Sequence, residues 1–146
     1  MPTRQAETTW VGGLQDGIGN VDLKSSQLGT FEVTFPKRAA DDANGSTSPE
    51  ELIAAAHSAC YAMALSGAIA QEGGTPRSLD VTASVSLGPD PSGGFRLTSI
   101  MLSVRGKVEG LDETGFERAA QIAKTDCPVS KALTGVDISL EATFIP

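Results

Sequence analysis

Residues 48–74 read SPEELIAAAHSACYAMALSGAIAQEGG, and they carry the strongest structural signal of the chain. Ser48, Pro49 and Glu51 form a helix-start pattern, with an N-cap hydroxyl, a proline in the first turn and a capping-box carboxylate. The run 52–70 that follows is almost wholly apolar, and the pair of glycines after it marks the helix end. A helix that is apolar nearly all round predicts a long central helix buried in the core of the protein.

The same run has close to the ~20 residues that a bilayer-spanning helix needs. It contains a histidine, two serines and a glycine, however, and polar or acidic residues close both ends, so we expect no membrane association. The N-terminal residues MPTRQAETTW lack the charged, apolar and cleavage regions of a signal peptide. We therefore expect a cytoplasmic protein whose cysteines are kept reduced.

Length and charge set the outer limits of function. The chain has 146 residues, of which 40% are hydrophobic, and this predicts a single domain over 1–146 with its own core. The 11 lysine and arginine residues against 18 acidic residues give a formal net charge of −7. Such a chain repels phosphate backbones, so a nucleic-acid partner is not expected.

On both sides of the central helix the sequence shows alternating or β-rich runs, which predict strands. They lie at 4–11, 21–24 and 30–35 before the helix, and at 79–87, 95–108 and 136–145 after it. A second amphipathic helix is predicted over 112–125, and glycine-rich links at 12–19 and 89–94 indicate hairpin connections. The order is βββ-α-ββ-α-β, which is typical of an α+β domain.

The only two cysteines of the chain, Cys60 and Cys127, lie in different settings. Cys60 is in the middle of the central helix, whereas Cys127 stands directly before Pro128 at the end of the second helix. A thiol within a helix that faces a thiol at a helix boundary is suited to reversible disulfide chemistry. Inert packing is the alternative, because a buried helical cysteine taken alone is most often a small core hydrophobe.

A second candidate group lies at the start of the central helix. Glu50 and Glu51 point about 100° apart, so Glu51 caps the helix while Glu50 is free to face a cation, or is a solvated surface acid. Lys37 and Arg38, after the third strand, are the nearest cations. Glu50 lies ~15 Å from Cys60 along the helix axis, so the two cannot meet within one chain. A site that uses both requires two such helices packed antiparallel, one from each subunit.

Two stretches, TSPEELIAAAHSACYAMAL at 47–65 and DCPVSKAL at 126–133, resemble the OsmC/Ohr family of thiol-dependent organic hydroperoxide reductases. The likeness begins at Thr9-Trp10 and extends to the final strand. It implies an OsmC-like fold built as an intertwined homodimer with two sites at the interface. Ohr members carry a catalytic arginine in the first hairpin, where this chain has GGLQ at 12–15. OsmC members carry it after the third strand, where Arg38 stands, so the resemblance is to the OsmC subfamily.

The resemblance also implies the role of each site residue. Cys60 is the peroxidatic thiol, Cys127 the resolving thiol, and Glu50 the carboxylate that holds a catalytic Arg38, with Lys37 as the alternative cation. Only a thiolate attacks a peroxide, and a guanidinium supplies the positive charge that favours it. The implied cycle reduces an organic hydroperoxide in oxidative and osmotic stress defence. It passes through a sulfenic acid and a disulfide that an external dithiol, of lipoyl type by resemblance, reduces without a cofactor.

Two other functions stay open on the residues. In a cysteine hydrolase Cys60 would be the nucleophile and His57, one turn earlier, its base. In a small-molecule-binding dimer on the same fold the thiols would be inert. One histidine and two cysteines make a poor zinc set, so no metal site is expected, and we expect His57 to be packed and hydrogen-bonded.

Overall fold

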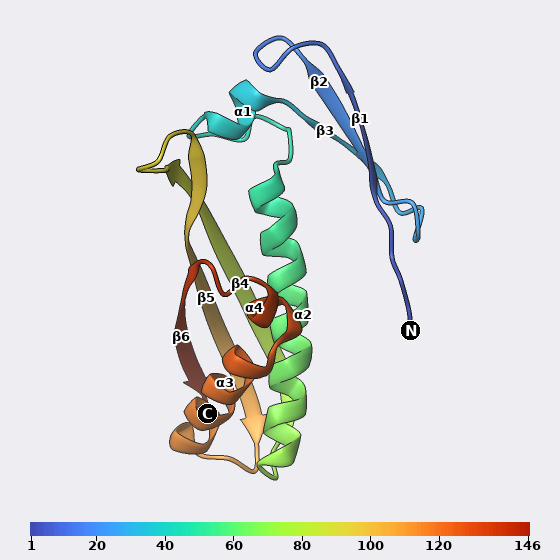
Figure 1. Ribbon diagram of the computed structural model, residues 1–146. Helices are drawn as coiled ribbons and strands as arrows, with labels where there is room; N and C mark the ends of the chain where they lie inside the picture. The colour runs from blue at the N-terminus through green and yellow to red at the C-terminus, as the bar shows by residue number, and fades with distance from the viewer. The chain divides into compact units, whose positions relative to one another are not determined.

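The structure, a computed structural model, describes residues 1–146 and confirms a mixed α+β protein (Figure 1). Its elements in order are β1 (Glu7–Val11), β2 (Ile18–Asp22), β3 (Thr30–Val33), α1 (Phe35–Ala39), α2 (Pro49–Gln71), β4 (Thr75–Pro89), β5 (Phe95–Glu109), α3 (Glu113–Asp126), α4 (Pro128–Ala132) and β6 (Asp137–Ile145). The chain divides into two compact units, Met1–Leu52 and Ile53–Pro146. The single domain over 1–146 stays a prediction.

The first unit is an antiparallel sheet of β1, β2 and β3 followed by α1. The strand predicted over 30–35 ends at Val33, and α1, which the sequence pattern did not predict, begins at Phe35. Thr34 is the N-cap, and its hydroxyl accepts a hydrogen bond from the Lys37 N–H at 3.3 Å. Pro36 favours this start because its ring fixes φ near the helical value.

Helix α2 begins where the capping pattern predicts. The Glu51 N–H donates to the Ser48 hydroxyl at 3.1 Å, while the Glu51 carboxylate accepts from the Thr47 hydroxyl at 2.6 Å. Gly73, with φ of +90°, follows the helix in the left-handed conformation that favours glycine after a helix end. α2 is the one helix of the chain that is long and apolar enough to cross a bilayer by length and composition.

The second unit is built on a sheet in which the two long strands β4 and β5 are antiparallel and β6 runs parallel to β5. Helices α2 and α3 lie along this sheet (Figure 1), and side chains of the helices and the sheet together form the hydrophobic core of the second unit. The Tyr61 hydroxyl donates to the Ala120 carbonyl at 3.0 Å and so joins α2 to α3. The buried core includes Tyr61, Leu65 and Ile69 of α2, Leu102 and Val104 of β5, and Phe116, Ala119, Ala120 and Ala123 of α3.

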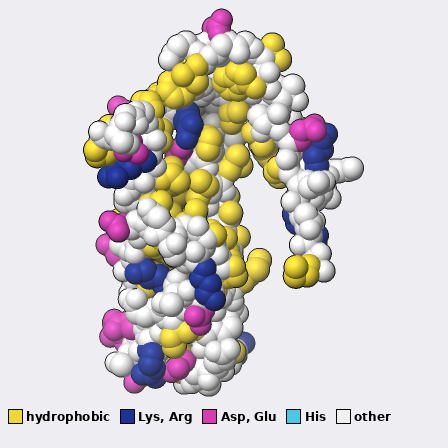
Figure 2. All heavy atoms as spheres, viewed as in Figure 1, with side chains coloured by type: hydrophobic (Ala, Val, Ile, Leu, Met, Phe, Trp, Pro, Cys, Tyr) yellow, Lys and Arg dark blue, Asp and Glu magenta, His cyan; other side chains and the backbone are white.

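Only one face of α2 is buried in the single chain, which corrects the expectation of a helix buried all round. The sheet and α3 cover the face that carries Tyr61, whereas hydrophobic side chains remain exposed along α2 (Figure 2). Met63 is 75% exposed on this second face. We call this the exposed α2 face; it consists mainly of small residues, namely Ala55, Ala56, Ala59, Met63, Gly67 and Ala70.

Candidate active site

The second unit brings together the two thiols that the sequence singled out. Cys60 lies on α2, Cys127 lies between α3 and α4, and the two thiols are close enough for each to shift the pKa of the other. Both are free thiols in the structure. Cys127 is 0% exposed, whereas Cys60 is half-buried, so a substrate can approach only Cys60.

The turn between α3 and α4 positions Cys127. Cys127 is at once the C-cap of α3 and the N-cap of α4, because Pro128 has no N–H to continue α3 and fits the first position of a new helix. This turn aims backbone donors at the sulfurs. The Val129 N–H lowers the pKa of both thiols and the Ser130 N–H lowers that of Cys127. The sequence pattern did not predict α4, and these two donors were missed with it.

The two thiols differ in acidity within one chain. Burial raises the pKa of Cys60, the Val129 N–H opposes this, and the contact with Cys127 raises it further. Burial is also the largest influence on Cys127 and raises its pKa, yet donation from the Ser130 N–H, the Cys60 thiol and other groups together lowers it. No lysine or arginine contributes to either pKa. Within one chain Cys127 is therefore the more acidic thiol.

A buried histidine lies behind Cys127. His57 is 0% exposed and its Nε2 is 2.7 Å from the Ser130 hydroxyl oxygen. The Ser130 hydroxyl in turn lowers the pKa of Cys127. Burial lowers the pKa of His57, so the ring is neutral at neutral pH. The expectation of a packed, hydrogen-bonded histidine is confirmed. Its partner is Ser130 rather than Cys60, and the chain has no cluster of three side chains placed to hold a metal ion.

The first unit pairs the predicted carboxylate and arginine. Arg38 Nη2 is 2.7 Å from Glu50 Oε1, and Nε is 3.1 Å from both carboxylate oxygens. Glu50 is 7% exposed, and a carboxylate so buried needs a charged or hydrogen-bonding partner. Lys37 instead pairs with Glu32 at 3.3 Å on the exposed surface. Of the two candidate cations, Arg38 is the one that contacts Glu50.

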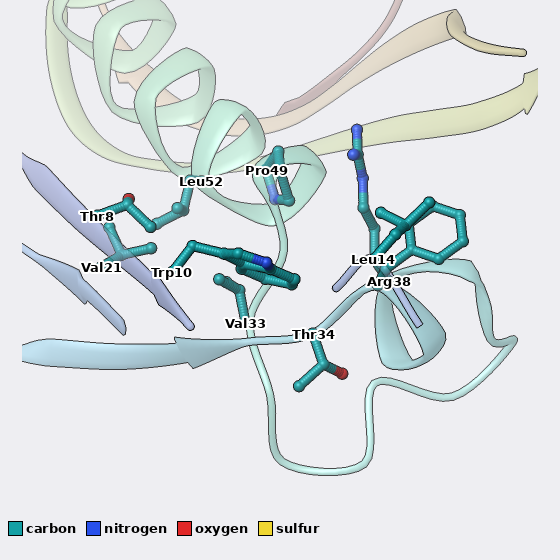
Figure 3. A pocket seen from close by; sticks show the side chains of 10 residues that line it. Thr8, Trp10, Leu14, Val21, Val33, Thr34, Arg38, Pro49 and Leu52 are labelled. Atoms are coloured by element: carbon teal, nitrogen blue, oxygen red, sulfur yellow. The ribbon is translucent and has the colours of Figure 1, made fainter. Parts of the chain in front are cut away.

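A pocket of about 530 Å³ lies beside Arg38 within the first unit (Figure 3). Arg38 is the one charged side chain in its lining, and the Trp10 ring forms part of the wall. A Cβ on Gly19 would lie 2.8 Å from the Trp10 ring, so this glycine lets the indole lie flat on β2. The pocket can hold an apolar group next to a guanidinium. Its lining is Thr8, Trp10, Leu14, Val21, Val33, Thr34, Phe35, Arg38, Pro49 and Leu52.

The chain is similar to a known protein family and to solved structures. Residues 41–141 match the family described as OsmC-like protein. The chain is 39% identical over 130 residues to Peroxiredoxin OsmC of Escherichia coli strain K12, which covers 89% of each chain. It is 32% identical over 143 residues to the organic hydroperoxide resistance protein OhrA of Bacillus subtilis, covering 96% of each. The crystal structure of an organic hydroperoxide resistance protein from Elizabethkingia anophelis matches with a TM-score of 0.76 at 28% identity, over 99% of this chain and 98% of that one.

Proposed function

Because this chain belongs to the OsmC-like protein family, we propose that it is a thiol peroxidase that reduces organic hydroperoxides to alcohols in oxidative and osmotic stress defence. The relatives are named as a peroxiredoxin and as organic hydroperoxide resistance proteins, which indicates a peroxidase-type activity. The observation that carries the proposal is that the half-buried Cys60 packs against the core cluster that contains the buried Cys127, and that each thiol shifts the pKa of the other.

In the first step the Cys60 thiolate attacks the terminal oxygen of the hydroperoxide. The O–O bond breaks, the alkoxide takes up a proton to become the alcohol, and Cys60 is left as a sulfenic acid. The exposure of the two thiols supports this order, because Cys60 is the one that a substrate can reach.

In the second step the Cys127 thiolate attacks the sulfenic sulfur of Cys60. An S–S bond forms, the S–O bond breaks, and the hydroxide that leaves is protonated to water. The two thiols already lie close enough to shift each other's pKa, so the attack needs only a short approach. Two electrons and two protons from an external dithiol, which we propose to be of lipoyl type, then restore both thiols.

Arg38 is proposed to act on Cys60 of a second copy of the chain. Within Ile53–Pro146 no cation lowers the pKa of Cys60, and burial raises it, so a thiolate at this position needs a positive charge from elsewhere. Glu50, which holds Arg38, lies ten residues before Cys60 on the same helix, or ~15 Å along its axis. Antiparallel packing of two α2 helices would bring Arg38 of one subunit to Cys60 of the other.

The exposed α2 face supports a homodimer. Small side chains such as Ala59 and Gly67 let two helices approach closely, and Met63 is an exposed hydrophobic side chain that such packing would cover. A second copy is therefore the proposed partner of this face.

The pocket beside Arg38 supports an organic substrate. An alkyl or aryl group can lie against Trp10 and Val33 while its peroxide group contacts the guanidinium. Arg38 Nη1 makes no hydrogen bond in the structure, so it is available to a peroxide oxygen.

The test is peroxide consumption by the purified protein with dihydrolipoamide as electron donor. We expect cumene hydroperoxide to be consumed faster than hydrogen peroxide, and Cys60→Ser to abolish both reactions. Ser58→Ala is the matched control, because its hydroxyl donates only to the Ala55 carbonyl on the same helix. A hydrolase or a binding module would instead keep two titratable thiols after stoichiometric cumene hydroperoxide, and that result would overturn the proposal.

A further inference from the structure

We propose that His57 and Ser130 form a buried hydrogen-bond relay in which His57 directs the Ser130 hydroxyl proton toward the Cys127 sulfur and so favours the thiolate form of that cysteine. Both are positioning residues. The relay is a property of the resting protein, whereas its consequence for turnover rests on the proposed peroxidase function.

The relay is a chain of three side chains that water does not reach. His57 and Cys127 are 0% exposed and Ser130 is 5% exposed. His57 Nε2 lies 2.7 Å from the Ser130 hydroxyl. That hydroxyl is also among the donors that lower the pKa of Cys127. A serine hydroxyl has one proton to donate. It can therefore donate to the histidine or to the sulfur, but not to both.

The other ring nitrogen of His57 decides between these directions. Nδ1 is buried and has no hydrogen-bond partner in the chain. A neutral imidazole carries its proton on one nitrogen, and a buried N–H without an acceptor is among the rarest unpaired groups in proteins. The hydrogen-bond network thus assigns the proton to Nε2 and leaves a bare lone pair on Nδ1. Nε2–H then donates to Ser130, whose own proton is directed to Cys127.

Burial is the largest influence on the pKa of Cys127 and raises it, so hydrogen-bond donors are the groups that favour its charged form. The titratable groups that act on its sulfur are Cys60 and Tyr61, both on α2, and no acidic or basic side chain is among them. The donors are the N–H groups of Val129 and Ser130, the Cys60 thiol and the Ser130 hydroxyl. Among these donors, the Ser130 hydroxyl is the one whose proton another side chain, His57, can direct.

The expected consequence lies in the second step of the cycle. A thiolate, and not a thiol, attacks the sulfenic sulfur of Cys60, so loss of the relay lowers the reactive fraction of Cys127. The first step uses Cys60 and is not slowed, because a less charged Cys127 raises the pKa of Cys60 less. A Cys60 sulfenic acid that waits longer for Cys127 is exposed to a second peroxide and to irreversible oxidation.

The first experiment titrates Cys127 alone, without peroxide. In the Cys60→Ser protein the only thiol is Cys127, so its ionisation can be followed by thiolate ultraviolet absorbance. The single tyrosine, Tyr61, does not interfere because burial raises its pKa above the usual range. We expect Ser130→Ala to lower the thiolate fraction at fixed pH about tenfold, since one hydrogen bond to the charged form is lost. Ser130→Thr, which keeps the hydroxyl, should stay close to the parent.

Variants of His57 separate the relay from packing. His57→Gln retains an N–H donor toward Ser130 and should keep most of the thiolate, whereas His57→Leu fills the space without a donor and should behave like Ser130→Ala. Ser58→Ala on the same helix is the matched control and should leave the titration unchanged. An unchanged titration in Ser130→Ala would overturn the relay. That outcome is independent of peroxidase activity, because no peroxide is present.

A second experiment reads the proton directly on the wild-type protein. His57 is the only histidine, so nitrogen NMR of histidine-labelled protein reports its tautomer without assignment. We expect a protonated Nε2 and an unprotonated Nδ1. A protonated Nδ1 would mean that Ser130 donates to the ring, and the relay would then be wrong. If the protein still consumes hydroperoxide at the normal rate, an unchanged titration or a protonated Nδ1 contradicts the relay and leaves the proposed peroxidase function standing.

Discussion

The Glu50 carboxylate holds the Arg38 guanidinium side-on, with Nη2 2.7 Å from Oε1 and Nε 3.1 Å from both oxygens. A side-on contact fixes the plane of the guanidinium as well as its position. The part of the guanidinium that carries Nη1 does not contact the carboxylate, and it therefore faces one fixed direction. Arg38 is a third exposed, so this part can be reached by a ligand.

Arg38→Ala should weaken the thiolate form of Cys60 in the assembled protein. Loss of a nearby positive charge raises the thiol pKa. Each pKa unit corresponds to ~1.4 kcal/mol and to a tenfold loss of thiolate. We expect at least a tenfold fall in peroxide reactivity at neutral pH. Arg38→Lys should recover part of it, because an ammonium keeps the charge but not the planar fork. The measurement is the pH profile of Cys60 alkylation.

Two controls accompany the arginine variants. Lys37→Ala should leave the profile unchanged, since Lys37 pairs with Glu32 at the surface. Arg38→Ala combined with Glu50→Gln removes the unpaired buried carboxylate, so that lost folding can be told from lost charge. A normal profile in Arg38→Ala together with a shifted one in Lys37→Ala would move the catalytic role to Lys37.

The two cysteine variants should fail in different ways. Cys60→Ser should abolish even a single turnover, because Cys127 is fully buried. Cys127→Ser should reduce one equivalent of peroxide and then accumulate a sulfenic or over-oxidised Cys60. Mass spectrometry of the two proteins after one equivalent of cumene hydroperoxide gives the result. Oxidation found first on Cys127 would reverse the assignment, as the lower pKa of that thiol within one chain would then suggest.

A site shared between subunits should be restored by mixing two inactive proteins. Cys60→Ser and Arg38→Ala each lose activity, but a heterodimer of the two contains one site with an intact Cys60 and an Arg38 from the other chain. We expect up to half of the wild-type activity per heterodimer after subunit exchange. Exchange demonstrated by mass without any recovery, or a monomer in sedimentation, would contradict the shared site.

His57 should make stability depend on pH in the acid range. Burial lowers its pKa in the folded state below the ordinary value of 6.5, so the folded protein favours the neutral ring. Its contribution to stability is present above pH 6.5 and is lost as the pH falls toward the folded-state pKa. The free energy of unfolding of the wild type should therefore decline below pH 6.5. His57→Gln should remove that part of the decline in urea unfolding, and equal slopes in both proteins would contradict this.

The sequence predicted long elements better than short ones. Helix α2 is marked by Ser48 and the glycines at its end, and the structure begins and ends it there. Helices α1 and α4 have five residues each, and a single proline is the main sign of either. Strands β4 and β5 extend to 15 residues each, because pairing from Thr75↔Glu109 to Pro89↔Phe95 continues the ladder past the alternating runs.

The residues of the candidate site also differ in how far the sequence alone identifies them. The sequence motifs name Cys60, Cys127 and Glu50 as candidates, and the family resemblance names Arg38, with Lys37 as the alternative. The structure pairs Arg38 with Glu50, and the catalytic roles stay a prediction. Ser130 could not, because its relation to His57 joins residues 73 positions apart and exists only once α4 packs beside α2. A serine three residues after a cysteine at a helix start is the one local sign of it.

The chain carries one tryptophan and one tyrosine, and they lie in different units. Trp10 forms a wall of the pocket in Met1–Leu52, and Tyr61 is locked in the core of Ile53–Pro146 by its bond to Ala120. Indole fluorescence, excited at a wavelength that the phenol does not absorb, therefore reports on the first unit, and the ring NMR signals of the single tyrosine report on the second. Coincident unfolding curves by both probes would identify one cooperative domain, whereas two midpoints would show that the arginine-bearing unit melts apart from the thiol-bearing one.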